Sequence, residues 1–290
     1  MSAVLADASV AALVAAIENN PVEYWRTCCD YLPDAEFHDE QELTWFATNI
    51  AAAPWFNQVM LARFAREQVD ARIDETLALF EARSVPMLWS VTPSASPPDL
   101  GRHLAAHGLS LSSTMAGMAV DLGALSEESS IPPGFTVERA ADVGMLEQWA
   151  EAYINGFEME EPAGRGMYER YLHIGFADEV PFRHYVGLLR GEPVASSTLF
   201  LGAGVAGIFH VGTVPAARRQ GIGAAMTLAP LREAATMGYR VGVLYASAMG
   251  TNVYRRLGFR EYFHVTQYNW PAAREGSMES VPSATDTSSR

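Results

Sequence analysis

The chain of 290 residues contains no lysine, because all 20 of its basic residues are arginines. This absence excludes Schiff-base enzymes, pyridoxal phosphate enzymes and proteins with a Walker-type phosphate loop, which all require a lysine side chain. Cysteine is nearly absent too, since Cys28 and Cys29 are the only two. Neighbouring cysteines seldom satisfy disulfide geometry, and this pair lacks metal-ligand spacing. The sequence therefore predicts no disulfide framework and no metal site.

Long hydrophobic runs are also missing. No apolar stretch approaches the roughly 20 residues that cross a bilayer. The first residues, MSAVLADASVAALVAAIENN, carry Asp7 and no early basic residue, unlike a signal peptide. Hydrophobic residues make up 49% of the chain, which is ample for a packed core. We therefore expect a globular cytoplasmic protein without a membrane partner.

Positive charge is scarce in the first half of the chain. The formal net charge is −14. Residues 1–130 hold 6 arginines against 18 acidic residues, net −12, whereas residues 131–290 hold 14 against 16, net −2. A half with net −12 repels DNA, RNA and anionic lipid, so we expect no nucleic-acid partner. An anionic ligand is tolerated best in the second half.

The stretch DLGALSEESSIPPG, from Asp121 to Gly134, is polar and ends in a proline pair and a glycine, which is typical of a linker. We place a domain boundary near Ser130, which gives domains at 1–130 and 131–270. The last residues are rich in Ser, Thr and other small polar residues and have almost nothing to bury. We predict a disordered tail at 271–290.

Hydrophobic periodicity in the second half alternates between strand and helix patterns. Residues 134–140 predict a strand, and residues 142–157 predict a helix with Asp142 as its N-cap. Three strand-like runs follow between 182 and 214, then a helix from Ala224, a strand, a short helix and a last strand. This order predicts an α/β (α+β) fold with a mixed, mostly antiparallel sheet flanked by helices.

Residues 218–223, RRQGIG, join the strand at 207–214 to the helix from Ala224. Gly221 and Gly223 let the backbone approach a bulky anion, and the start of a helix favours negative charge. The joint resembles a pyrophosphate cradle in which Arg218 and Arg219 contact phosphate oxygens. A tight packing turn stays open as an alternative. A Rossmann dinucleotide site fits less well, because Met226 stands where its third glycine belongs.

The order of motifs adds a family resemblance. Arg218-x-x-Gly221-x-Gly223 follows VGTVP and precedes a strand and Tyr254-x-x-x-Gly258-Phe259. This order resembles the GNAT N-acetyltransferase superfamily over about residues 134–270, most strongly over 207–260. The resemblance implies that acetyl-CoA, as co-substrate, binds the loop and the strand before it. The implied cofactor-binding residues are Gly212, Thr213, Val214, Arg218, Arg219, Gln220, Gly221, Ile222, Gly223, Ala224, Ala225 and Ser247, the last standing where relatives often have Asn.

The resemblance also implies catalytic roles. Tyr254 takes the place of the family's general acid, since a phenol with a pKa of about 10 can protonate a thiolate whose conjugate acid has a pKa of about 8.5. Backbone N–H groups from Val211 to Val214 would polarise the thioester carbonyl. Many relatives keep a Glu near Val211 as general base, and this chain has none, so His210 is our candidate; a core role for it stays open. Glu158 and Glu160 fall in the substrate loop, where they either attract the amine or form a solvated acidic loop.

The first half repeats this plan in a degenerate form. Matching Gly108 to Gly258 sets Leu104 opposite Tyr254, and matching Ser84 to Gly238 sets Glu67 opposite Gly221 and Val69 opposite Gly223. A carboxylate repels phosphate, so this half resembles a GNAT domain without a cofactor site, as in tandem GNAT proteins. Two roles stay open for it: one wall of the acceptor pocket, or a face of a homodimer. His103 and His107 lack the Glu of a zinc-protease motif and are expected on an exposed helix face.

Together these features predict an acetyl-CoA-dependent N-acetyltransferase. It would transfer an acetyl group to the primary amine of a small molecule by direct attack in a ternary complex. The alternative is a non-catalytic acyl-CoA-binding or sensor protein, and a scaffold without a ligand stays open as a third class.

Overall fold

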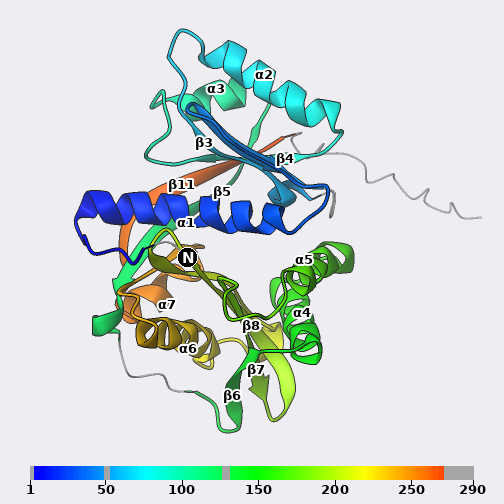
Figure 1. Ribbon diagram of the computed structural model, residues 1–290, viewed down its shortest axis with the longest axis vertical. Helices are drawn as coiled ribbons and strands as arrows, with labels where there is room; N and C mark the ends of the chain where they lie inside the picture. Colours follow the sequence, from blue (N-terminus) through cyan, green and yellow to red (C-terminus); the bar gives the residue numbers. More distant parts are fainter. Residues whose placement is uncertain (1–2, 49–52, 126–130, 271–290) are drawn as a thin grey trace, which may run out of the picture.

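The computed structural model describes residues 3–48, 53–125 and 131–270. The predicted boundary at Ser130 and the predicted tail at 271–290 lie outside these residues. A single 11-stranded sheet runs through both halves, with helices on its faces (Figure 1). Most of its strand pairs are antiparallel. This architecture confirms the predicted fold class.

The first half supplies the strands at one end of the sheet. Its elements are α1 (Val10–Asp30), β1 (Glu36–Asp39), β2 (Leu43–Ala47), η1 (Pro54–Phe56), β3 (Asn57–Ala62), α2 (Val69–Ala82), β4 (Met87–Val91), α3 (Leu100–Ala106), β5 (Ser110–Asp121) and η2 (Leu122–Ala124). None of the helices in the described parts of the chain combines the length and the apolar character that a membrane span requires.

The second half follows the predicted order of elements and adds one helix. Its elements are β6 (Phe135–Ala140), α4 (Val143–Phe157), α5 (Glu161–Ile174), β7 (Phe182–Leu189), β8 (Glu192–Gly202), β9 (Val205–Thr213), η3 (Pro215–Ala217), α6 (Ile222–Thr236), β10 (Val241–Ala246), α7 (Thr251–Arg256) and β11 (Arg260–Trp270). Asp142 caps α4 as predicted, because its carboxylate accepts the N–H of Met145. Helix α5 begins inside the stretch interpreted as a substrate loop, which is therefore shorter than expected.

The strand order shows that the two halves exchange their last strands. The order is β1-β2-β3-β4-β11-β5-β10-β9-β8-β7-β6. Strand β5 pairs with β10 from Val241↔Asp121 to Ala246↔Ala116, and β11 pairs with β4. The exchange makes one continuous sheet out of two similar halves. Alternation of apolar and polar residues predicts a strand but not its partner, so the sequence did not indicate this exchange.

Matching turns show that the two halves share one plan. Ser84 and Gly238 both adopt positive φ at the end of a helix, and the next residue donates its N–H back into that helix in each case. Gly108 and Gly258 repeat this geometry before β5 and β11, with φ of 86° and 98°. The turns support the alignment that places Leu104 opposite Tyr254.

Helix α1 belongs to the first half by sequence but also docks on the strands of the second half. It lies between the two halves and contacts β5, β8, β9, β10 and β11 (Figure 1). Asn20 is buried, and its side-chain amide donates to the carbonyl of Gly202 at 2.8 Å. Gly207 lies directly beneath it, since a Cβ at that position would stand 1.9 Å from Asn20 Oδ1.

Candidate active site

Strands β9 and β10 separate after only two residue pairs. They run parallel and pair at Gly242↔Ala206 and Val243↔Gly207. Beyond these pairs a cavity of about 300 Å³ occupies the opening. Both strands, α1 and the stretch from β10 to α7 line it, with Phe157 and Met115 at its sides. The cavity therefore lies where the two halves meet.

The loop from β9 to α6 presents unpaired backbone N–H groups. Arg219 and Gly221 adopt positive φ of 62° and 81°. The first N–H groups of α6 that find an acceptor are those of Ala224 and Ala225, which both donate to the carbonyl of Gly221. The N–H groups of residues 219–223 have no partner in the described chain, and a Cβ at Gly223 would meet nothing within 4 Å. This open corner has the geometry of an anion site.

The two arginines of the loop differ. Arg218 donates through Nε to the carbonyl of Thr213 and through Nη2 to the carbonyl of Gly156 and the Glu158 carboxylate, each at 3.0 Å. This differs from the expectation that its guanidinium contacts phosphate, because the end of α4 packs against it. Arg219 is exposed and has no partner in the described chain.

The two substrate-loop carboxylates lie outside the cavity lining. Glu158 ends α4 with φ of 52° and pairs with Arg218, so it links the end of α4 to the loop at 218–223. Glu160 is exposed and stands at the start of α5 without capping it through its side chain. The structure therefore does not bring either carboxylate into the lining of the cavity.

Tyr254 and Ser247 both line the cavity. The ring of Tyr254 packs edge-on against Phe259, with centroids 5.8 Å apart. Burial raises the pKa of Tyr254 to about 12, although the hydroxyl of Thr227 opposes the shift. The phenol therefore keeps its proton at neutral pH, as a general acid must. The hydroxyl of Ser247 accepts the N–H of Gly250 at 3.3 Å.

His210 lies at a bulge in β9 and is surrounded by aromatic rings. The register between β8 and β9 shifts here, and His210 adopts φ of 54°. Its Nε2 lies 3.0 Å from the hydroxyl of Tyr24, which is itself 2.5 Å from the hydroxyl of Tyr171. Burial lowers the pKa of His210 to about 3, and the charge of Arg170 adds to this shift. The imidazole is neutral at physiological pH. Sequence reasoning missed both tyrosines, because α1 and α5 bring them from distant positions.

Some backbone N–H groups just before the loop at 218–223 already have hydrogen-bond partners. The N–H of Val214 donates to the carbonyl of Val194 at 2.9 Å, so this group is not free to polarise a carbonyl. Gly156 packs against Gly212 and Thr213, since a Cβ at Gly156 would stand 3.1 Å from the amide nitrogen of Thr213. The end of α4 thus fixes the position of β9 next to the cavity.

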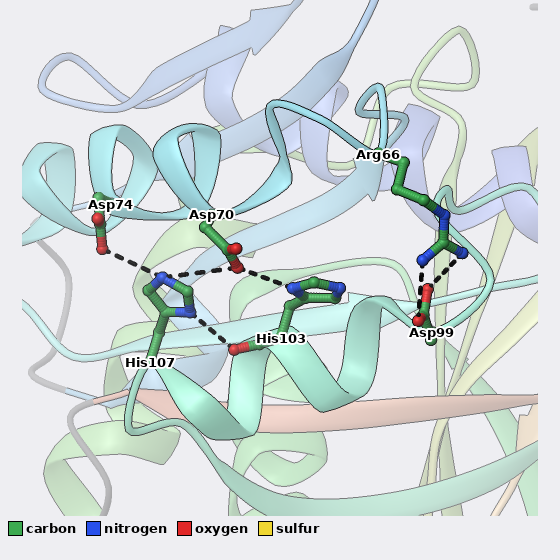
Figure 2. A network of polar contacts seen from close by, with 6 residues as sticks. All are labelled: Arg66, Asp70, Asp74, Asp99, His103 and His107. Atoms are coloured by element: carbon green, nitrogen blue, oxygen red, sulfur yellow. Dashed lines mark hydrogen bonds and ion pairs between the residues drawn. The ribbon is translucent and has the colours of Figure 1, made fainter.

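In the corresponding corner of the first half, an arginine is paired with a carboxylate (Figure 2). Strands β3 and β4 also separate after two residue pairs. Arg66, in the loop before α2, forms a two-pronged ion pair with Asp99 at 2.9 and 3.2 Å, which bridges the gap to α3. In the second half the residue before α7 in the equivalent place, Met249, is exposed. Because Arg66 is paired with Asp99, its guanidinium is not free to bind a phosphate.

His103 and His107 face α2, so the prediction of an exposed helix face is wrong. Figure 2 shows both rings pointing at carboxylates of that helix. His103 contacts Asp70 at 2.7 Å, and His107 contacts Asp74 at 3.4 Å. No group of His, Cys, Asp and Glu residues in the described ranges has an arrangement that would hold a metal ion.

Comparison with known proteins places this site in a family. The family model described as "Acetyltransferase (GNAT) domain" matches residues 128–256, which include the opening between β9 and β10, the loop and Tyr254. Residues 128–256 are therefore similar to the GNAT superfamily, as the sequence resemblance implied. The match supports the predicted assignment as an acyltransferase. A sequence search of curated proteins gives no match.

Solved structures extend the likeness to the whole chain. A GCN5-related N-acetyltransferase from Kribbella flavida aligns with a TM-score of 0.66 at 19% identity, over 87% of this chain and 93% of that chain. A GCN5-related N-acetyltransferase from Sphaerobacter thermophilus aligns with a TM-score of 0.58 at 16% identity, over 79% of this chain and 80% of that chain. A tandem GNAT protein from the clavulanic acid biosynthesis pathway aligns with a TM-score of 0.56 at 14% identity, over 92% of this chain and 96% of that chain. These likenesses support the GNAT fold in a tandem arrangement.

Proposed function

We propose that this protein transfers the acetyl group of acetyl-CoA to the primary amine of a small molecule. One observation carries the proposal: residues 219–223 leave their N–H groups unpaired at the start of α6, the helix that follows β9, and β9 itself lines the cavity through residues 208–211. The N–H groups suit the diphosphate, and the cavity suits the thioester arm and the acceptor. Cofactor and amine meet in one cavity, so the amine attacks the thioester directly.

Tyr254 acts as the general acid in this proposal. As the amine nitrogen bonds to the acetyl carbon, the C–S bond breaks and the sulfur takes the phenolic proton. Burial raises the pKa of Tyr254 to about 12, so the proton is present throughout the neutral range. Solvent then reprotonates the phenolate. Backbone N–H groups of β9 that face the cavity stabilise the charge on the carbonyl oxygen.

His210 assists the amine without becoming a stable imidazolium. Its pKa of about 3 makes it too weak a base to hold a proton taken from an ammonium group. Its neutral ring accepts a hydrogen bond from the amine instead, and the proton that the nitrogen loses as the amide forms passes to solvent. The same apolar surroundings lower the pKa of a bound ammonium, because burial disfavours the charged form. The acceptor therefore reacts as a free amine.

Calorimetric titration with acetyl-CoA tests the proposal. We expect saturation at one molecule per chain, because Arg66 in the corresponding corner of the first half is already paired with Asp99. Absence of heat at high micromolar ligand, with folded protein, would overturn it. A thiol-release screen of amino acids, polyamines, aminoglycosides and peptide N-termini then separates an enzyme from an acyl-CoA sensor. Cofactor binding without release for any amine would favour the sensor.

A further inference from the structure

A second, smaller cavity adjoins the active-site cavity. It has a volume of about 120 Å³ and shares Pro21, Phe209 and Tyr245 with the larger one. Its far wall is formed by Gln58 and Met60 of β3 and by Ser90 of β4, together with Thr92. It therefore lies in the first half's own strand opening, the counterpart of the thioester site.

The two cavities differ in chemistry. The larger one is mainly apolar, and none of its lining residues is a carboxylate. The smaller one is lined by polar side chains too, and the uncharged Gln58, Ser90, Thr92 and Gln267 each have a hydrogen-bond partner on the protein. Gln58 donates to the carbonyl of Trp55 at 2.7 Å. Gln267 donates to Ser90 at 3.4 Å, and Thr92 lies 3.4 Å from the hydroxyl of Ser94. Glu18 lines it as well.

Glu18 of α1 is a buried carboxylate without a counter-ion. It is 8% exposed, and its Oε1 accepts the N–H of Ser94 at 2.9 Å. Its Oε2 has no partner in the described chain, and no arginine or histidine there forms an ion pair with it. Burial raises the pKa of the neighbouring Tyr245, and the charge of Glu18 raises it further. A carboxylate that lines a cavity and has one oxygen without a partner is stabilised by a positively charged ligand.

We propose that Glu18 binds a second, positively charged group of the acceptor. The inference rests on the proposed function and names its substrate class: diamines and related amines with a cationic far end and an apolar middle. The reacting amine lies beside His210 and Tyr254. The apolar segment passes Pro21, Phe209 and Tyr245, and the far ammonium pairs with Glu18 Oε2. The first half's strand opening thus contributes to acceptor recognition.

A matched pair of acceptors tests this. Alkyl monoamines and the α,ω-diamines of equal chain length are compared by thiol release, in wild type and in Glu18→Gln. The glutamine still accepts the Ser94 N–H through its amide oxygen, so the fold is preserved. The control is Glu151→Gln, an exposed carboxylate on α4. We expect Glu18→Gln to lower kcat/KM for the best diamine by about tenfold or more, which is the scale of a lost buried charge pair. The kcat/KM for the monoamine of equal chain length should stay unchanged.

A binding measurement separates this inference from the proposed function. Calorimetry with the diamine, with and without CoA, should show binding to wild type and to Glu151→Gln, and about tenfold weaker binding to Glu18→Gln. Equal kcat/KM for monoamine and diamine, or equal effects of Glu18→Gln on both, would overturn the inference while leaving the transferase in place. Diamine binding without acetyl transfer would support the Glu18 site and contradict the transferase.

Discussion

Burial has opposite effects on the two central side chains of the site. It raises the pKa of Tyr254 to about 12 and lowers that of His210 to about 3. Both are therefore neutral at pH 7, one with a proton to donate and the other with a lone pair to accept a hydrogen bond. Both pKa shifts have one physical cause, because desolvation in the apolar cavity disfavours the charged form of each side chain.

The first prediction concerns Tyr254→Phe. The change removes the proton donor and keeps the ring that packs on Phe259. We expect kcat to fall by about 10²-fold or more, the usual scale of general acid catalysis, with unchanged affinity for acetyl-CoA. Turnover by thiol release and calorimetry measure the two effects. Tyr262→Phe, on β11 away from the active-site cavity, serves as the control. Unchanged turnover in Tyr254→Phe would remove Tyr254 from the mechanism.

The second prediction concerns the stability of the fold at low pH. The pKa of His210 is about 3 in the folded chain and about 6.5 when unfolded, so the unfolded state binds more protons between these values. Stability is therefore lost as the pH falls through this window, by about 1.4 kcal/mol per pH unit from this residue. His210→Gln should show a shallower slope in urea unfolding measured from pH 6.5 downward. Parallel slopes would show that the ring is not buried.

At the scale of an element, the loop at 218–223 joins a strand to a helix through two glycines that differ in conformation and surroundings. Gly221 has φ of 81°, a conformation that a side chain disfavours. Gly223 lies in the first turn of α6 and has open space where a Cβ would stand. Backbone conformation requires the first glycine, and access to the unpaired N–H groups requires the second.

Alanine substitutions distinguish the two glycines. Gly221→Ala should destabilise the fold by about 1 kcal/mol because of its positive φ. Gly223→Ala should leave stability unchanged and weaken acetyl-CoA binding by about tenfold, the scale of one lost hydrogen bond to a charged group. Chemical unfolding and calorimetry measure each variant, with Gly238→Ala, at the far end of α6, as a positive-φ control that spares binding. Strong cofactor binding by Gly223→Ala would contradict the assignment of this corner.

Elements could be predicted from the sequence where their signals are local. The loop at 218–223, the helix of Tyr254 and the cap of α4 each depend on neighbouring residues, so the sequence indicated them. The contact between Tyr24 and His210 depends on α1 crossing to the other half, and α5 was missed because its amphipathic pattern is interrupted by glycines at Gly164 and Gly166. Pairing across the chain is a tertiary property, and a single sequence gives no partner for it.

At the scale of the whole molecule, the strand exchange makes each half depend on the other. Strand β10, next to the active-site cavity, is paired along its length with β5 of the first half. Helix α1 covers the same cavity. Without the first half, β10 would have an unpaired edge and buried apolar side chains would face water. We therefore expect that the second half does not fold as a separate unit.

This dependence gives the last prediction. Residues 131–290 expressed alone should not fold into a form that binds acetyl-CoA, because β5 and α1 are absent. Co-expression of residues 1–130 as a second chain should restore folding and acetyl-CoA binding. The strands of the two halves need to pair, but they do not need to be covalently joined. Size-exclusion chromatography should then show a stable two-fragment complex, and calorimetry should show acetyl-CoA binding as in the intact chain. If the isolated second fragment is monomeric, folded and binds acetyl-CoA with full affinity, the exchanged strands are not required for the site.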